Sequence, residues 1–281
     1  MKIVHTIADL RRELAFFRDA RESIGFVCTM GALHQGHQSL IKTARMNAKR
    51  VVASIFVNPL QFSDKKDFEK YTNVLGRDAA LLESVGTALL FAPSSVTEMY
   101  GDGFQSAVEV GDLSKPFEGV DRPGHFRGVS TVVAMLLNLV QPEFAVFGEK
   151  DFQQLRVVEQ VVADLKIPVR IMRGPTIREE GGLAMSSRNS RLSAQGLERA
   201  RAISRGLFIA RDAFAGGNRE GSFLRSLVIE ALRLEPGIEI SYVALVDERT
   251  LKELDVAAAP CRMLAAATIE GVRLIDNIAL I

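Results

Sequence analysis

The stretch Gly25–Lys49, GFVCTMGALHQGHQSLIKTARMNAK, contains the local pattern that decides the fold. Its first residues, Gly25–Met30, form an apolar run that predicts a buried strand, and Ser39–Lys49 has the length of a helix. Gly31 and Gly36 lie between them and indicate a turn in which the backbone can approach a ligand closely. This strand–turn–helix order predicts one unit of a parallel sheet.

The same alternation continues along residues 1–175 and then changes. Short, continuously apolar runs alternate with helical stretches, which is typical of a parallel sheet covered on both faces. After the turn at 179–182, two helical stretches precede three strand-like runs, and this order predicts a smaller α+β domain. The predicted strands are 25–30, 51–57, 88–91, 144–147, 169–172, 238–246, 262–269 and 272–276. The predicted helices are 39–49, 78–85, 126–140, 152–165, 194–214 and 219–234.

Composition and charge exclude several classes of protein. The chain has 281 residues, 47% of them hydrophobic and 25% charged, with a formal net charge of +1. This balance offers no bulk electrostatic attraction for nucleic acid. The longest apolar stretch, Val129–Val140, is far shorter than the roughly 20 residues that a membrane-spanning helix needs, and the first residues do not resemble a signal peptide. Cys28 and Cys261 lie far apart in apolar surroundings, so we expect buried free thiols in a cytoplasmic protein with no membrane partner.

Two of the chain's four histidines, His34 and His37, lie where the first predicted strand turns into a helix. The carboxyl end of a parallel strand is where α/β sheets bind ligands, and a helix N-terminus favours phosphate. Three residues apart, both imidazoles can face the same side and donate hydrogen bonds to phosphate oxygens. The alternatives are two ordinary surface histidines or half of a zinc site, although no third ligand is nearby in the sequence.

Polar residues follow two further predicted strands. Asn58 and Gln61 come after the second strand, and their amides suit recognition of a hydroxyl or a carboxylate. After the strand 144–147, Lys150 is placed to meet phosphates, Asp151 to cap the next helix or touch a ribose, and Gln154 lies one turn into that helix. The alternative is a turn asparagine and an exposed glutamine for the first segment and a solvated charged turn for the second.

Two other segments give weaker signals. Ser186, Ser187 and Arg188 could grip a triphosphate with two hydroxyls and a guanidinium. The loop 122–127, RPGHFR, is a second anion contact or, more simply, the N-terminal turn of a helix. Gly-x-Ser-x-Gly, Walker A and Gly-x-Gly-x-x-Gly patterns are absent, which disfavours a serine hydrolase, a P-loop enzyme and a Rossmann dehydrogenase.

Five segments, taken in this order, resemble the pantothenate synthetase (pantoate–β-alanine ligase) family over nearly the whole chain. One such segment would mean little, whereas five at these separations form a specific pattern. The family shares an HxGH-type nucleotide site on a Rossmann-like sheet with cytidylyltransferase-like and class I synthetase proteins. The five segments are TMGALHQGH at 29–37, FVNPLQF at 56–62, RPGHFRGV at 122–129, FGEKDFQQ at 147–154 and MSSRN at 185–189.

The resemblance implies a fold and an ATP site. It implies a Rossmann-like ATP- and pantoate-binding domain at 1–176 and a smaller α+β lid domain at 177–281. His37 is the usual acid candidate, and His34, Lys150 and Arg188 would offset charge on the phosphates with it. The residues implied to contact ATP are Met30, Gly31, Ala32, Leu33, His34, Gln35, Gly36, His37, Gly148, Glu149, Lys150, Asp151, Ile177, Met185, Ser186, Ser187 and Arg188.

The resemblance also implies the other ligands and the assembly. Gln61 and Gln154 would hold pantoate, with Asn58 as a supporting polar contact, and Asp78 is a candidate Mg²⁺ carboxylate. Mg²⁺ would accompany ATP, with no tightly bound organic cofactor. The family is typically a cytoplasmic homodimer. One departure is visible, because Thr72-Asn73 stands where the family usually has Pro-Arg after a tyrosine, in a loop flanking the pocket.

The implied reaction is the ATP-dependent condensation of (R)-pantoate with β-alanine, which yields pantothenate, AMP and diphosphate through a pantoyl-adenylate. Such a ligase serves the biosynthesis of vitamin B5 and coenzyme A. The nearest alternative is a nucleotidyl transferase that keeps the nucleotide on its product, such as a cytidylyltransferase. A nucleotide sensor or RNA-binding module is a further alternative, disfavoured by the near-neutral charge.

Overall fold

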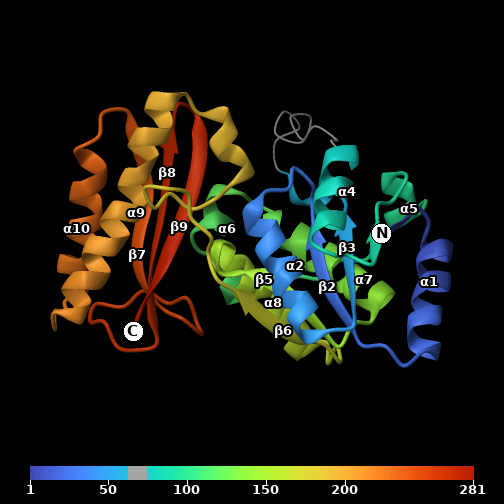
Figure 1. Cartoon of the computed structure of the whole chain (residues 1–281). Helices are drawn as coiled ribbons and strands as arrows, with labels where there is room; N and C mark the ends of the chain where they lie inside the picture. The colour runs from blue at the N-terminus through green and yellow to red at the C-terminus, as the bar shows by residue number, and fades with distance from the viewer. Residues whose placement is uncertain (63–74) are drawn as a thin grey trace. The chain divides into compact units, whose positions relative to one another are not determined.

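The computed structural model of the protein describes residues 1–62 and 75–281. The chain divides into two compact units (Figure 1). Unit 1 contains Met1–Glu149 and Gln153–Pro175, and unit 2 contains Lys150–Phe152 and Thr176–Ile281. Each unit has its own sheet and is described by itself.

Unit 1 is built on a six-stranded sheet in the order β1-β4-β3-β2-β5-β6, and every pair of neighbours is parallel. From β2 the chain moves through β3 to β4 on one side, and later through β5 to β6 on the other. The order of the strands therefore reverses between β2 and β5, the type of position where such sheets bind ligands. The strands are β1 (Lys2–Val4), β2 (Ile24–Thr29), β3 (Arg50–Ile55), β4 (Leu89–Phe91), β5 (Phe144–Gly148) and β6 (Arg170–Gly174).

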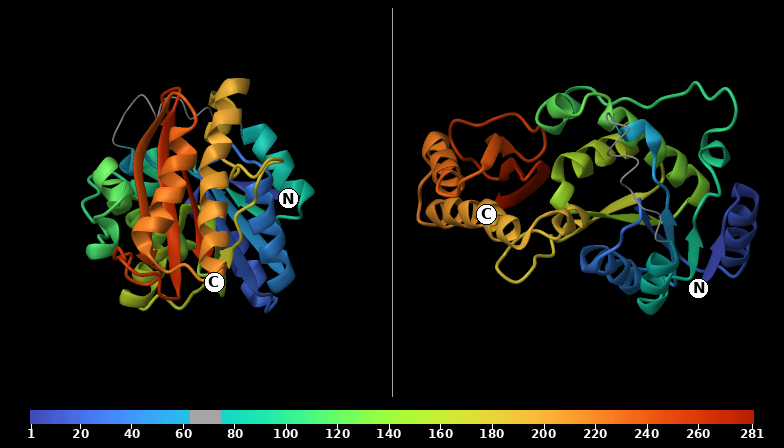
Figure 2. Two further views of the ribbon diagram at one scale, coloured as in Figure 1. Left: turned by 90° about the vertical axis from the view of Figure 1, so that its left-hand side faces the viewer. Right: turned by 90° about the horizontal axis from the view of Figure 1, so that it is seen from above.

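Helices cover both faces of this sheet, as Figure 2 shows from above. Val27 and Ala53 pack with α2 and α4, while their neighbours Phe26 and Val52 are equally buried on the opposite face. Because strands covered on both sides need apolar residues at every position, the continuous apolar runs follow directly from this arrangement. The helices of unit 1 are α1 (Ile7–Asp19), α2 (Gln35–Asn47), α4 (Leu75–Ser84), α5 (Val96–Tyr100), α6 (Glu118–Asp121), α7 (His125–Val140) and α8 (Phe152–Asp164), whose first residue belongs to unit 2.

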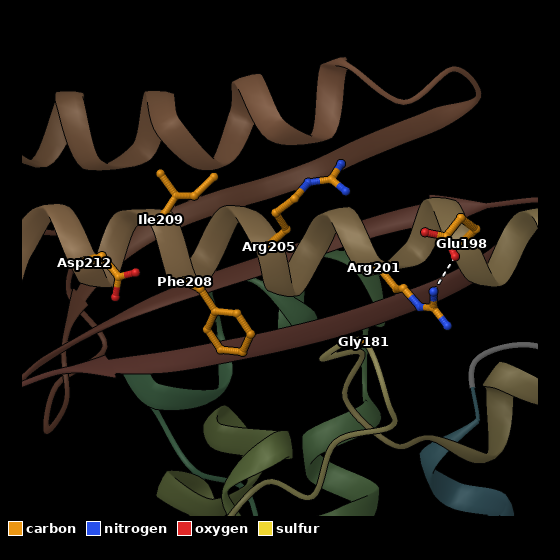
Figure 3. Close-up of a pocket in the computed structure, with 7 residues that line it drawn as sticks. All are labelled: Gly181, Glu198, Arg201, Arg205, Phe208, Ile209 and Asp212. Carbon is orange, nitrogen blue, oxygen red and sulfur yellow. Dashed lines mark hydrogen bonds and ion pairs between the residues drawn. The ribbon is translucent and has the colours of Figure 1, made fainter.

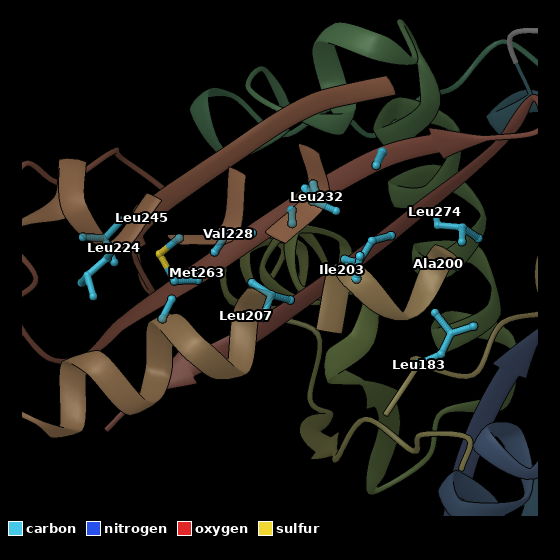
Figure 4. Close-up of a cluster of buried hydrophobic side chains, with 14 of the residues drawn as sticks. Leu183, Ala200, Ile203, Leu207, Leu224, Val228, Leu232, Leu245, Met263 and Leu274 are labelled. Atoms are coloured by element: carbon cyan, nitrogen blue, oxygen red, sulfur yellow. The ribbon is translucent and has the colours of Figure 1, made fainter. Parts of the chain in front are cut away.

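Unit 2 packs two helices on a three-stranded antiparallel sheet. Its order is β7 (Ile238–Asp247), β8 (Cys261–Ile269) and β9 (Val272–Leu280), with α9 (Ala194–Ala215) and α10 (Gly221–Arg233) as the helices. The helices pack against each other and cover the sheet, since α9 contacts β8 and β9 while α10 contacts β7. Figure 4 shows the apolar core between helices and sheet, with Ile203, Leu207, Val228 and Met263 among its members.

The α/β fold class predicted from the sequence is confirmed, and the predicted strands and long helices form within a few residues of their expected bounds. The structure also contains β1, α1 and the short helices α5 and α6, which were not predicted. The last predicted strand ends at residue 276, whereas β9 continues to Leu280. Cys28 and Cys261 are both free thiols; Cys261 is buried and Cys28 is only partly buried. No helix of residues 1–62 and 75–281 has the length and apolar character to cross a membrane.

One close approach between two backbone segments of unit 1 requires a glycine, which has no side chain. Gly128, in the first turns of α7, lies against the short 3-10 helix η1 (Pro59–Gln61). A Cβ atom built on Gly128 would lie 2.3 Å from the carbonyl oxygen of Leu60 and 2.6 Å from the backbone nitrogen of Gln61. Both atoms are backbone, so they cannot move aside as a flexible side chain could.

We therefore expect Gly128→Ala to lower the free energy of unfolding by about 1–3 kcal/mol through overpacking, although alanine is the better helix former. Urea denaturation measures this. The matched control is Gly76→Ala in α4, where an added Cβ meets nothing within 4 Å; it should leave stability unchanged or raise it by about 0.5–1 kcal/mol. Equal stabilities of the two variants would contradict the close approach.

Candidate functional site

The loop between β2 and α2 has an unusual backbone conformation, and a hydrogen bond from another helix holds it in place. Gly31 and Ala32 both have positive φ, 86° and 52°, and for alanine this conformation costs about 1–2 kcal/mol. The next residue, Leu33, donates its backbone N–H to Oδ1 of Asp78 on α4 at 3.0 Å. Asp78 is buried, with 2% of its surface exposed. Backbone strain that is held in place by surrounding groups, here a buried carboxylate, is common at functional sites.

His34 and His37 cap the helix that they begin. His34 is the N-cap of α2, and its Nδ1 accepts the backbone N–H of Gly36 at 3.1 Å. In return, Nδ1 of His37 accepts the backbone N–H of His34 at 3.3 Å. The two ring centroids are 4.2 Å apart. Because each Nδ1 accepts a hydrogen bond, the proton of each neutral ring is on Nε2, which makes both Nε2–H groups donors.

Asn58 is the centre of a buried polar network after β3. Only 1% of its surface is exposed, and its Nδ2 donates to Oε1 of Gln61 and to the carbonyl of Gly128, both at 3.0 Å. Its Oδ1 accepts the backbone N–H of Leu60 at 3.2 Å and the hydroxyl of Tyr100 at 2.5 Å. Burial raises the pKa of Tyr100 well above its usual value, so the hydroxyl keeps the proton that it donates. Both ends of the Asn58 amide are therefore satisfied.

Gln61 joins this network to the β2–α2 loop. Its Nε2 donates to Sδ of Met30, and its backbone carbonyl meets Nδ1 of His125 at 2.9 Å and Nη2 of Arg122 at 3.4 Å. The segment 122–129 thus holds Gln61 through the start of α7. The sequence left this segment open as a second anion contact or the N-terminal turn of a helix, and it did not indicate the contacts with Gln61 or the role of Tyr100.

These pieces share one edge of the sheet in unit 1. β2 lies between β3 and β5 and pairs with both in parallel, so the carboxyl ends of the three strands are neighbours. The segments that follow them carry His34 and His37, then Asn58 and Gln61, and then Gly148 and Glu149. Gln154 is in the first turn of α8 with a partly exposed side chain. Among the residues that the structure describes, no hydrogen bond joins Gln154 to Asn58 or Gln61.

The remaining candidate residues belong to unit 2. Lys150 and Asp151 are in the 3-10 helix η3 (Glu149–Asp151), with 3.5 Å between the Lys150 ammonium and the Asp151 carboxylate. Ile177 accepts the backbone N–H of Met185 at 2.9 Å, so these two segments lie side by side.

Ser186, Ser187 and Arg188 follow Met185. Ser186 is the N-cap of the 3-10 helix η4 (Ser187–Arg191), and its Oγ accepts the N–H of Arg188 at 3.2 Å. The structure therefore groups the two hydroxyl residues with the guanidinium-bearing residue in one tight turn. Such a turn combines backbone donors with a cation, a suitable combination for binding phosphate.

A groove in unit 2 lies apart from these candidates. The groove, of about 430 Å³, runs along α9 (Figure 3), and none of the predicted site residues lines it. Its arginines pair with acids nearby, Arg201 with Glu198 and Arg205 with Glu235.

Among residues 1–62 and 75–281, no group of three or more His, Cys, Asp or Glu residues could hold a metal ion. The departure at Thr72-Asn73, in the loop 63–73, lies outside the described residues.

The chain is similar to known proteins over its full length. A family model described as pantoate-beta-alanine ligase matches residues 2–279. Pantothenate synthetase 1 of Bradyrhizobium diazoefficiens is 46% identical over 281 residues, which cover 100% of this chain and 98% of that protein.

Two solved structures agree with this similarity. The crystal structure of pantothenate synthetase from Thermus thermophilus matches with a TM-score of 0.94 at 46% identity, covering 100% of this chain and 99% of that one. The pantoate-beta-alanine ligase from Francisella tularensis, complexed with beta-gamma ATP and beta-alanine, matches with a TM-score of 0.81 at 34% identity and covers 100% and 98%. Since the family model, the sequence relative and both structures span essentially the whole chain, the protein belongs to the pantoate–β-alanine ligase family.

Proposed function

We propose that this protein is an ATP-dependent ligase that condenses (R)-pantoate with β-alanine to give pantothenate, AMP and diphosphate. Membership of the family over residues 2–279 is the observation that carries the proposal. The polar groups collected at the carboxyl ends of β2, β3 and β5 support it, because parallel sheets bind nucleotides at this edge.

The reaction has two steps. The pantoate carboxylate attacks the α-phosphorus of ATP, a P–O bond forms, and diphosphate leaves to give pantoyl-adenylate. The amine of β-alanine then attacks the acyl carbon, the amide forms, and AMP leaves with the acyl C–O bond broken. A free carboxylate is a poor acceptor for an amine, and adenylation gives it a leaving group. The protein contributes mainly positioning and the stabilisation of developing charge.

His34 and His37 are proposed to donate Nε2–H hydrogen bonds to the reacting phosphates. Their reciprocal caps support this, since each cap fixes a ring through Nδ1 and assigns the proton of the neutral ring to Nε2. The rest of the segment Met30–His37 is proposed to contact ATP through its backbone. Donors that are already fixed need no reorganisation as charge develops, which is the basis of electrostatic catalysis.

The other candidate residues keep the roles implied by the resemblance. Gln61 and Gln154 are proposed to hold pantoate, with Asn58 fixing the amide of Gln61. Gly148–Asp151, Ile177 and Met185–Arg188 are proposed to contact ATP, with Lys150 and Arg188 facing its phosphates. The lid function of residues 177–281 stays a prediction.

Mg²⁺ is proposed to accompany ATP, and Asp78 to contribute to its binding. The Oδ1 atom of Asp78 accepts the N–H of Leu33, which leaves Oδ2 as a hard oxygen donor. A single carboxylate fits Mg²⁺, which usually binds through one or two carboxylates together with substrate phosphates and water. The ion would neutralise charge on the phosphates when bound.

Two finer statements also belong to the proposal. We propose that the protein is a homodimer, which light scattering on the purified protein tests directly. We propose that it functions in the cytoplasm, in keeping with its free cysteines.

The function is tested by exchange of labelled diphosphate into ATP. We expect exchange that requires pantoate, and on adding β-alanine we expect AMP and an amide product in equal amounts. A product that retains the nucleotide would instead indicate a cytidylyltransferase-like transfer. ATP binding without pantoate-dependent exchange would indicate a nucleotide sensor and overturn the proposal.

The charge-stabilising roles predict large losses of rate. We expect His37→Ala and Lys150→Ala each to slow adenylate formation by roughly 10²–10³-fold, the usual cost of removing one such donor. Single-turnover release of diphosphate measures the step. Lys252→Ala, at an exposed lysine of unit 2, is the control and should keep the wild-type rate. Wild-type rates in either test variant would remove that residue from the proposed chemistry.

The role of Asp78 is tested by Asp78→Asn. The amide oxygen can still accept the N–H of Leu33, so we expect an unchanged melting temperature. Loss of the carboxylate charge should raise the Mg²⁺ concentration for half-maximal rate by about 10-fold. An unchanged Mg²⁺ requirement would show that Asp78 only holds the β2–α2 loop.

A further inference from the structure

In unit 2, one dipeptide of β9 contacts both segments that carry candidate ATP residues. Asp276 and Asn277 are each 4% exposed. The Asn277 side chain donates from Nδ2 to the backbone carbonyl of Lys150 at 2.8 Å. The Asp276 carboxylate binds Arg178, the neighbour of Ile177, through two hydrogen bonds of 2.6 and 3.0 Å. The two segments are far apart in sequence, and this dipeptide links them.

The chemistry at position 277 is specific to an amide. Oδ1 of Asn277 accepts from Nη1 of Arg262 at 2.6 Å, while Nδ2 donates to Lys150. A guanidinium can only donate and a carbonyl can only accept, so the side chain between them must accept on one side and donate on the other. Aspartate satisfies Arg262 but has no donor for the Lys150 carbonyl.

Arg262 is itself held in a fixed position. Its Nε donates to Oε1 of Glu248 at 2.9 Å, and its guanidinium carbon lies 4.0 Å from the centroid of the Phe152 ring. Arg262 is 5% exposed. The turn that contains Lys150 is therefore fixed on two sides, by Asn277 at its carbonyl and by Arg262 against the aromatic ring that follows it.

Arg178 fixes the second segment in the same way. Besides binding Asp276, its Nη1 donates to the carbonyl of Gly182 at 3.0 Å, and the residue forms an isolated antiparallel bridge with Ala184. The bridge continues into the hydrogen bond between Met185 N–H and the Ile177 carbonyl. Asp276 thus anchors the bridged segments from which Met185–Arg188 begins.

We propose that Asp276 and Asn277 are positioning residues of the ligase reaction, which hold Lys150 and the segment Ile177–Arg188 in a fixed mutual arrangement. The proposal rests on the proposed function. Neither side chain needs to touch a substrate: Asn277 acts through the backbone of Lys150, and Asp276 acts through Arg178. Small displacements of charge-stabilising groups cost large factors in rate, so such supports affect the reaction directly.

The two positions should affect the kinetic constants differently, with KM for ATP changed mainly through Asp276. A charge-stabilising group such as Lys150 interacts more strongly with the transition state than with the bound substrate. Displacing it therefore lowers kcat. Ile177 is proposed to bind the nucleotide equally before and during reaction, so loosening it raises the KM for ATP, whereas loosening Arg188 on the same segment also lowers kcat. A loss of folded protein would lower apparent kcat alone and would leave KM and single-turnover rate constants unchanged.

The first experiment measures single-turnover diphosphate release, with saturating ATP and pantoate, by Asn277→Asp. We expect the rate constant to fall by about 10-fold, less than the roughly 10²-fold that a displacement of about 1 Å can cost. Asn218→Asp is the matched control, because it adds the same charge within unit 2 and its oxygen can still accept the N–H of Glu220. The control should keep the wild-type rate constant.

The second experiment repeats Asn277→Asp in the Lys150→Ala protein. If Asn277 acts through Lys150, the added substitution should change the remaining rate by less than about 2-fold, because the interaction that it supports is already gone. A further 10-fold loss in that background would overturn the proposal, as would a wild-type rate for Asn277→Asp alone. If Asn277→Asp does not fold, Asn277→Ala takes its place in the same cycle.

The third experiment is steady-state analysis of Asp276→Asn. We expect the KM for ATP to rise by about 10-fold together with a fall in kcat, because the anchored segment carries both Ile177 and Arg188, and an unchanged KM would overturn the role of Asp276. The wild-type protein is assayed first in each series. Absence of pantoate-dependent exchange in the wild type means failure of the proposed function. Wild-type activity with unaffected variants means failure of the positioning proposal alone.

Discussion

The structure of unit 1 depends on how a parallel sheet ends. Backbone groups inside the sheet pair with neighbouring strands, but those just beyond the carboxyl ends of β2 and β3 have no strand to pair with. Buried polar groups without partners are costly, so side chains must supply the missing bonds. Asp78 accepts the N–H of Leu33, and Asn58 accepts the N–H of Leu60 and donates to the Gly128 carbonyl. The edge that carries the candidate site is therefore built by local satisfaction of the backbone.

This requirement gives single residues two roles. His34 and His37 complete the start of α2 with their Nδ1 atoms, and the same bonds fix their rings and assign the proton to Nε2. A histidine without a cap populates two neutral tautomers and several rotamers, and fixing one of them when a ligand binds costs free energy. In this protein the cap bonds fix each ring during folding. Structural capping and presentation of donors are thus consequences of the same two hydrogen bonds.

The fold was largely predictable from the sequence, and the site only in part. Strand–turn–helix units leave a local signal in apolar periodicity, and Gly31, Gly36 and the two histidines of the first turn lie close enough in sequence to be recognised as a phosphate-binding type of turn. By contrast, Tyr100, Gly128 and His125 support Asn58 and Gln61 from other elements. No local pattern indicates those roles, because they exist only after α5 and α7 have packed beside η1.

In unit 2, buried polar side chains also hold irregular segments, but the backbone group that is bound differs. In unit 1 a buried carboxylate accepts a loop N–H, whereas on β9 a buried amide donates to the carbonyl of Lys150 and a buried carboxylate binds Arg178. In each case a residue inside a regular element fixes an irregular segment through one of its backbone groups or through a neighbouring side chain. The regular element cannot move without losing its packing, so it transfers its rigidity to the loop. Under the positioning proposal, a polar side chain in such a core position affects the chemistry as well as the stability, because the loops can present charged groups precisely only where their backbone is held.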